Sequence, residues 1–87
     1  MKIKKASENI FEDLGFSKAE AANLEARSRL MMLLEDEIKK LKVSNNDAAK
    51  ILGVKAPRIS ELFHGRIEKF SLDLLVSYLA RLGKRVD

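Results

Sequence analysis

Two short amphipathic segments, over residues 45–52 and 56–64, are the clearest pattern of apolar and polar positions in this chain. Within each segment the apolar residues recur three or four positions apart, as they do on one face of an α-helix. Ile59 and Leu62 lie three apart, so we expect both to face the first segment. The partners expected there are the small or apolar residues Ala48, Ala49 and Leu52.

A glycine turn separates the two segments. Gly53 is expected to end the first helix in the left-handed conformation, which is easily adopted only by glycine. Val54 would then fill the turn, and Pro57 falls in the first turn of the second helix, where its missing N–H is not needed. This packing pattern is typical of a DNA-binding helix-turn-helix, whose second helix enters the major groove. We predict that the unit spans about residues 45–64.

The rest of the chain is predicted to be helical as well. A short turn of helix is expected within residues 9–16, and Ser17 with Glu20 predicts a capping box at the start of a long helix over residues 18–41. The first half of that helix is expected to project beyond the core. Ser71 is expected to cap the last helix. The expected buried face of the last helix comprises Leu72, Leu75, Val76, Leu79 and Leu82.

Composition is consistent with one small domain. The chain has 87 residues, of which 46% are hydrophobic and 34% charged, enough for a modest core. We therefore predict a single domain over residues 1–87 with an all-α fold. The absence of cysteine excludes disulfides and thiolate chemistry. No apolar run approaches the roughly 20 residues of a membrane span, and the basic residues 1–5 do not lead into the apolar stretch of a secretory signal, so we expect a cytoplasmic protein.

Charge favours a polyanionic partner. The formal net charge is +4, and residues 43–70 hold five basic side chains against three acidic ones. The predicted phosphate contacts are Asn45, Asn46 and Lys50 in the first helix of the unit, and Arg66 and Lys69 in the loop after the second. The alternative is that these side chains are simply solvated.

Base readout is expected from the outer face of the second helix and the residue before it. Arg58 has the geometry to pair with guanine or with phosphate, and Glu61 can accept from cytosine N4 or simply face solvent. Together with these two, the predicted DNA-facing residues are Lys55, Ala56 and Pro57. The predicted partner is therefore double-stranded DNA.

The segments 9–16, 17–42 and 43–85 together resemble the small XRE-type (Cro/CI-like) helix-turn-helix regulators, especially the antitoxin branch of HigA-type proteins. The likeness is most specific in residues 9–16, 57–62 and 79–86. It implies a five-helix bundle of the lambda-repressor-like helix-turn-helix type that binds an operator sequence-specifically, usually as a homodimer. In toxin–antitoxin operons it also implies a partner toxin of the ribosome-dependent RNase type.

Three positions differ from that family. Asn45 stands where a glutamine typically contacts the DNA backbone, Lys55 replaces a serine or threonine cap, and Ala56 replaces a long polar side chain such as glutamine. Alanine can still touch a thymine methyl group, and lysine can still reach guanine or phosphate. The leading hypothesis is a dimeric transcriptional regulator that acts as a repressor, and its finer form is the antitoxin of a toxin–antitoxin pair. The second is a protein-interaction module, neutralising a toxin or assembling a complex, with weak or no DNA binding.

Other candidate chemistry is sparse. His64 is the single histidine and precedes a glycine, so we expect it to be a cation at the helix end or a cap, with phosphate as a further contact. The acidic residues 35–37 point in three directions on a helix and are expected to be solvated. The four apolar residues 31–34 predict either an oligomer or partner surface, or a helix covered on two sides. Because the chain has neither a phosphate-binding glycine loop nor a nucleophile–base pair, we expect no enzyme activity, no cofactor and no metal.

Overall fold

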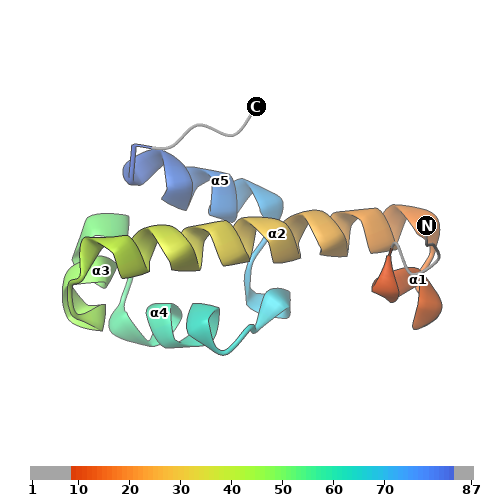
Figure 1. The fold of residues 1–87 in the computed structure, drawn as a ribbon, viewed down its shortest axis with the longest axis horizontal. Helices are drawn as coiled ribbons and strands as arrows, with labels where there is room; N and C mark the ends of the chain where they lie inside the picture. The colour runs from red at the N-terminus through yellow and green to blue at the C-terminus, as the bar shows by residue number, and fades with distance from the viewer. Residues whose placement is uncertain (1–8, 84–87) are drawn as a thin grey trace.

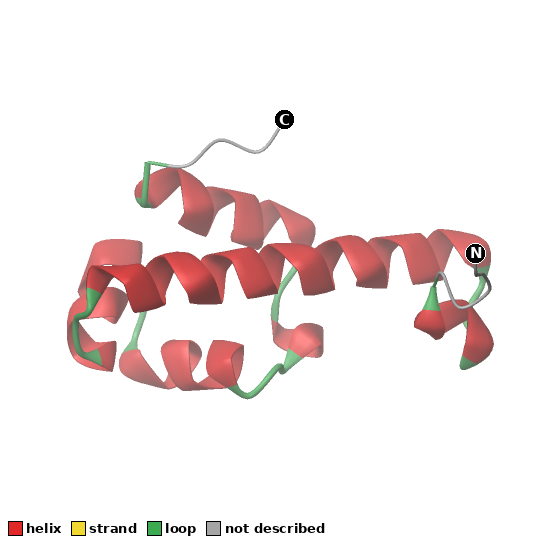
Figure 2. Cartoon of the chain, viewed as in Figure 1, coloured by secondary structure: helices red, strands yellow, loops and turns green. Residues whose placement is uncertain are grey.

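The computed structural model describes residues 9–83, and every regular element within that range is helical (Figures 1 and 2). The predicted all-α fold with five α-helices is confirmed. The basic residues 1–5 and the basic tail 84–87 lie outside the described residues. The elements in chain order are α1 (Ile10–Asp13), α2 (Lys18–Leu41), α3 (Asn45–Leu52), α4 (Ala56–Phe63), the 3-10 helix η2 (Ile67–Lys69) and α5 (Leu72–Arg81).

The long helix α2 is the axis of the molecule, with α5 on one side of it and α4 on the other (Figure 1). Its predicted capping box is present: the Ser17 hydroxyl accepts from the Glu20 N–H at 3.1 Å, and the Glu20 carboxylate accepts from the Ser17 N–H at 3.2 Å. Its first half projects beyond the core, as expected. There α1 packs against it, and the Asn9 amide donates to the Ala21 carbonyl oxygen at 3.1 Å.

The core lies where the second half of α2 meets the other helices. Ile59 and Leu62 are buried, and so are their expected partners on α3, which confirms the predicted packing between α3 and α4. One large buried residue was not expected: Phe70, in the segment between η2 and α5, is 1% exposed. The largest fully buried side chains are Phe70, Leu34, Ile59, Leu62, Leu75 and Leu79.

Two expectations about burial were wrong. Val76 is 40% exposed, whereas Tyr78 is 7% exposed and joins the core. On a helix of 100° per residue, Val76 and Tyr78 flank the common direction of Leu75 and Leu79 at equal angles, so helix geometry alone does not choose between them. Tyr78 packs edge-on against the buried Phe70 ring, with the ring centroids 6.4 Å apart. Glu37 was expected to be solvated, but its side chain is only 12% exposed and lies 3.3 Å from the Lys40 ammonium group.

The apolar stretch 31–34 is covered on one side only. Met31 and Leu34 are buried in the core, whereas Met32 is 62% exposed and Leu33 is also exposed. Within the part of the chain that the structure describes, α2 is therefore not doubly covered at this point, and an apolar strip remains at the surface.

The turn between α3 and α4 spans three residues and begins with Gly53 at a φ of 74°, in the left-handed conformation that was predicted. The Gly53 N–H donates to the Lys50 carbonyl at 3.2 Å, and the Val54 N–H donates to the Ala49 carbonyl at 2.9 Å. These are the two bonds of a Schellman motif. The end of α4 repeats the motif around Gly65, at a φ of 71°.

This repetition gives a matched pair of variants. A Cβ at Gly53 would lie 2.7 Å from Nη1 of Arg81, whereas a Cβ at Gly65 would meet nothing within 4 Å. The guanidinium is the flexible end of its side chain and can move aside, so backbone strain should dominate at both sites. We expect Gly53→Ala and Gly65→Ala each to lower the free energy of unfolding by about 1–2 kcal/mol, measured by urea denaturation.

The comparison separates strain from contact. Adding Arg81→Ala to Gly53→Ala should leave the penalty of the glycine substitution nearly unchanged. A Gly53→Ala protein as stable as the parent would mean that the left-handed turn is not present in solution.

Candidate nucleic-acid interface

One face of α4 packs in the core and the other is exposed to solvent. Ile59 and Leu62 are buried in the core, while Pro57, Ser60 and His64 are exposed. These three exposed positions are separated by three and four residues, so they share one side of the helix. The second helix of the motif therefore presents a polar face to solvent.

The predicted phosphate-contacting residues of α3 are exposed. Asn45 and Asn46 are the first two residues of the helix, where N–H groups and the helix dipole favour an anion. The preceding Ser44 hydroxyl accepts from the Asp47 N–H at 3.1 Å and caps the helix. Lys50 is also exposed, one turn further along. The two asparagines and Lys50 do not line either of the two hollows described below.

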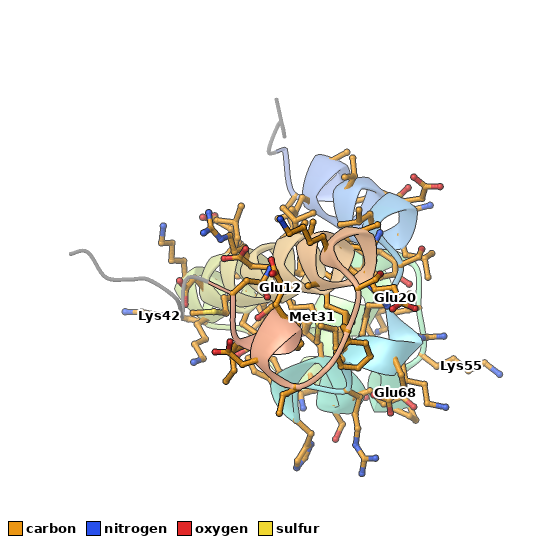
Figure 3. The ribbon with its side chains drawn as sticks, turned by 90° about the vertical axis from the view of Figure 1, so that its right-hand side faces the viewer. Glu12, Glu20, Met31, Lys42, Lys55 and Glu68 are labelled. Carbon is orange, nitrogen blue, oxygen red and sulfur yellow. The ribbon has the colours of Figure 1, made fainter. Side chains whose placement is uncertain are left out.

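A hollow of about 350 Å³ lies beside the start of α4. It brings together four of the predicted DNA-facing residues. Lys55, the N-cap of α4, is exposed, and Figure 3 shows its side chain extending into solvent on the side opposite Lys42. Ala56 is half-buried and does not line the hollow. The lining residues are Val54, Lys55, Pro57, Arg58, Glu61 and Tyr78.

Arg58 is directed toward the protein itself. Its guanidinium Nη1 donates to the Lys69 carbonyl oxygen at 2.8 Å, and the guanidinium carbon lies 5.5 Å from the centre of the Phe70 ring. The Glu61 carboxylate is 3.7 Å away from the same nitrogen. Arg58 therefore links α4 to the segment that follows it, and reading a base in the bidentate manner would require it to give up these contacts.

A second arginine holds that segment from the opposite helix. Arg27, on α2, donates from Nη1 to the carbonyl oxygens of Ile67 and Phe70, each at 3.2 Å. Its Nε donates to the Asn23 side chain at 2.7 Å, which fixes the direction of the guanidinium. Sequence reasoning missed Arg27, because these partners lie about forty residues away along the chain and no local pattern links them.

A second hollow, of about 370 Å³, lies at the other end of α4. It brings the predicted Glu61, Arg66 and Lys69 together. Ser60 and His64 also line it and were not predicted as site residues. Their helical spacing from Pro57, an expected DNA-facing residue, is the signal that would have found them.

Two helices joined by a glycine turn, the second with its polar face open, define a helix-turn-helix protein, the class of DNA-binding regulators. The chain matches the family described as "Helix-turn-helix domain" over residues 10–87, and it therefore belongs to that family. Such domains are typically non-enzymatic. Comparison with curated proteins gave no significant match. In the described part of the chain, no helix has the length and apolar character to cross a membrane.

The contacts of Arg58 lead to a stability prediction. Arg58→Ala should lower the free energy of unfolding by about 1–2 kcal/mol, because a charge-assisted hydrogen bond and a cation–π contact are lost. Arg58→Lys keeps the charge but not the planar fork, so it should recover only part of that loss. The measurement is urea denaturation, with amide exchange of the segment 66–70 as a local readout.

Lys50→Ala is the matched control, because it removes an exposed cation elsewhere in the same motif and should change stability by less than about 0.5 kcal/mol. Equal stability of the Arg58→Ala protein and this control would show that Arg58 does not hold the segment.

Proposed function

We propose that this protein is a sequence-specific transcriptional repressor, a single domain that places α4 in the major groove of its operator. The observation that carries the proposal is the arrangement of α4 after the Gly53 turn, with its apolar face in the core and its polar face open. Repression would follow from occlusion of a promoter by the bound protein.

In the proposed complex, the side chains divide into three groups. Backbone phosphates are contacted from both ends of the motif, by Asn45, Asn46 and Lys50 and by Arg66 and Lys69. Base edges are approached by the first turns of α4, through Ala56, Pro57 and Glu61, and Lys55 at the N-cap of α4 contacts a further phosphate. Arg58 acts as a positioning residue, because its guanidinium already holds the carbonyl of Lys69.

We also propose that the protein binds as a twofold homodimer, since half-sites about 34 Å apart are the usual target of paired recognition helices. The exposed apolar side chains of α2 and α5 support this proposal, because a second copy of the protein would cover them in the dimer. Val76 on α5 is the clearest of them, because it faces away from the core.

Sedimentation tests the dimer. The parent protein should sediment as a dimer at tens of micromolar, and Val76→Lys should shift it toward the monomer without loss of helical circular dichroism. Leu33→Lys, a substitution of the same kind on α2, tells whether the interface extends beyond α5. A parent protein that sediments only as a monomer, with and without DNA, would rule out the proposal.

The finer role that we propose is that of an antitoxin, with a small toxin protein as second partner. It is supported by the resemblance in residues 9–16, 57–62 and 79–86, and by the exposed apolar residues Ile10 and Leu14 around α1. Copurification with the product of the adjacent gene is the deciding measurement. An orphan gene with no such product would remove this role and leave the repressor.

DNA binding itself is tested with three charge and length variants. Lys55→Gln should weaken binding to a duplex from the upstream region and to a scrambled duplex alike, and should lower the salt slope by about 1. Lys18→Gln removes the same charge at the first residue of α2, the end of that helix that lies far from α3 (Figure 1), and should leave affinity nearly unchanged. Ala56→Gln should instead change base preference, favouring adenine at one position by about 1–3 kcal/mol.

Fluorescence anisotropy at two salt concentrations gives all three results. If the parent and all three variants bind both duplexes equally weakly, α4 does not read the base sequence. The interaction module would then be the better description of the protein.

A further inference from the structure

His64 has a defined tautomer. Its Nδ1 lies 2.8 Å from the Ser60 carbonyl oxygen, and 3.3 Å from the Ser60 hydroxyl. A carbonyl oxygen only accepts hydrogen bonds, so Nδ1 carries the proton. In the neutral ring the remaining nitrogen, Nε2, is therefore an acceptor. Protonation turns Nε2 into a charged donor, and no other side chain of the protein changes charge in the same pH range unless its pKa is strongly shifted.

The hollow that His64 lines contains few charged groups, so one added positive charge changes its net charge substantially. The hollow at the end of α4 contains the cations of Arg66 and Lys69 and the carboxylate of Glu61. The carbonyl end of a helix, where His64 stands, disfavours an anion. With a neutral imidazole the hollow holds two cations against one carboxylate, and with an imidazolium it holds three. The charge of His64 thus decides how well the hollow receives an anion.

We propose that this hollow binds one phosphate group of the DNA backbone, with Arg66, Lys69 and the Nε2–H of protonated His64 as donors, so that protonation of His64 tightens DNA binding. The proposal rests on the proposed function and adds a subsite and a proton linkage to it. The linkage has a definite sign: the proton is taken up on binding, so affinity rises as the pH falls through the range in which histidine titrates.

The composition of the chain makes the linkage traceable. His64 is the only histidine in 87 residues. A competing carboxyl is that of Glu35 on α2, which lines a separate hollow together with Gly65. Burial raises the pKa of the Glu35 carboxyl, with Lys39 acting against the rise and Asp36 adding to it. Glu35→Gln is therefore the matched control, since it removes a titrating neighbour that does not line the proposed phosphate site.

The experiment measures affinity by fluorescence anisotropy at constant ionic strength, from about pH 7.0 to pH 5.5, below the range of an α-amino group. The probes are a labelled upstream duplex and a scrambled duplex of equal length. Affinity of the parent for both should rise about threefold over this range, because binding of the phosphate favours the protonated form of His64. NMR of the imidazole should show the titration midpoint moving to higher pH when either duplex is added.

Two substitutions of His64 test whether its imidazole is the group that takes up the proton. His64→Gln should bind both duplexes at all pH values about as weakly as the parent does at the upper end. His64→Lys should bind as tightly as the protonated parent, without pH dependence. Glu35→Gln should retain the rise in affinity. Circular dichroism checks that each variant is folded.

The outcomes separate this proposal from the one it rests on. If the parent binds with no dependence on pH, or if His64→Gln keeps the full pH response, the phosphate subsite is overturned and DNA binding is left intact. A pH response confined to one duplex also overturns it, because the contact would then be to a base edge. A parent protein that binds neither duplex at any pH overturns DNA binding itself.

Discussion

The close packing of α3 against α4 across Gly53 is the constraint on which the exposed surface depends. Ala48 and Ala49 are small, so Ile59 and Leu62 of the second helix reach the core beside them. Once those two residues are buried, the helical period places Pro57 and Ser60 on the open side, while Arg58 turns back toward the segment after α4. The left-handed conformation of Gly53 makes this crossing possible within three residues. The hydrogen bonds from the N–H groups of Gly53 and Val54 end the first helix before the second begins.

The segment after α4 depends on a different kind of contact. It has little regular structure of its own, yet Arg66 and Lys69 must be presented on the same side as α4 if they are to reach one DNA backbone. Two guanidinium groups, from Arg58 and Arg27, donate to its carbonyl oxygens from α4 and from α2, and the buried ring of Phe70 anchors its end. Hydrogen bonds from a charged guanidinium are stronger than those between neutral groups, so the segment is held in place by the fold.

Local signals were sufficient for the helices and insufficient for these contacts. The capping box at Ser17 and the turn at Gly53 were predicted because caps and glycines act within a few residues. The bonds of Arg27 were not predictable, since they join segments that only the tertiary fold brings together. Tyr78 and Val76 were exchanged for a similar reason: both suit a helix face, and the neighbouring elements decide which one is buried.

The internal use of Arg58 also changes how a DNA complex of this protein would obtain specificity. Without that side chain, the first turns of α4 offer one long cation, Lys55, beside the short or rigid Ala56 and Pro57. Few bidentate base contacts are then available, each of which is worth about 1–3 kcal/mol. Most of the binding free energy would come from phosphate contacts, which depend strongly on salt and do not read sequence directly. Discrimination would rest on half-site spacing in a dimer and on the deformability of the operator.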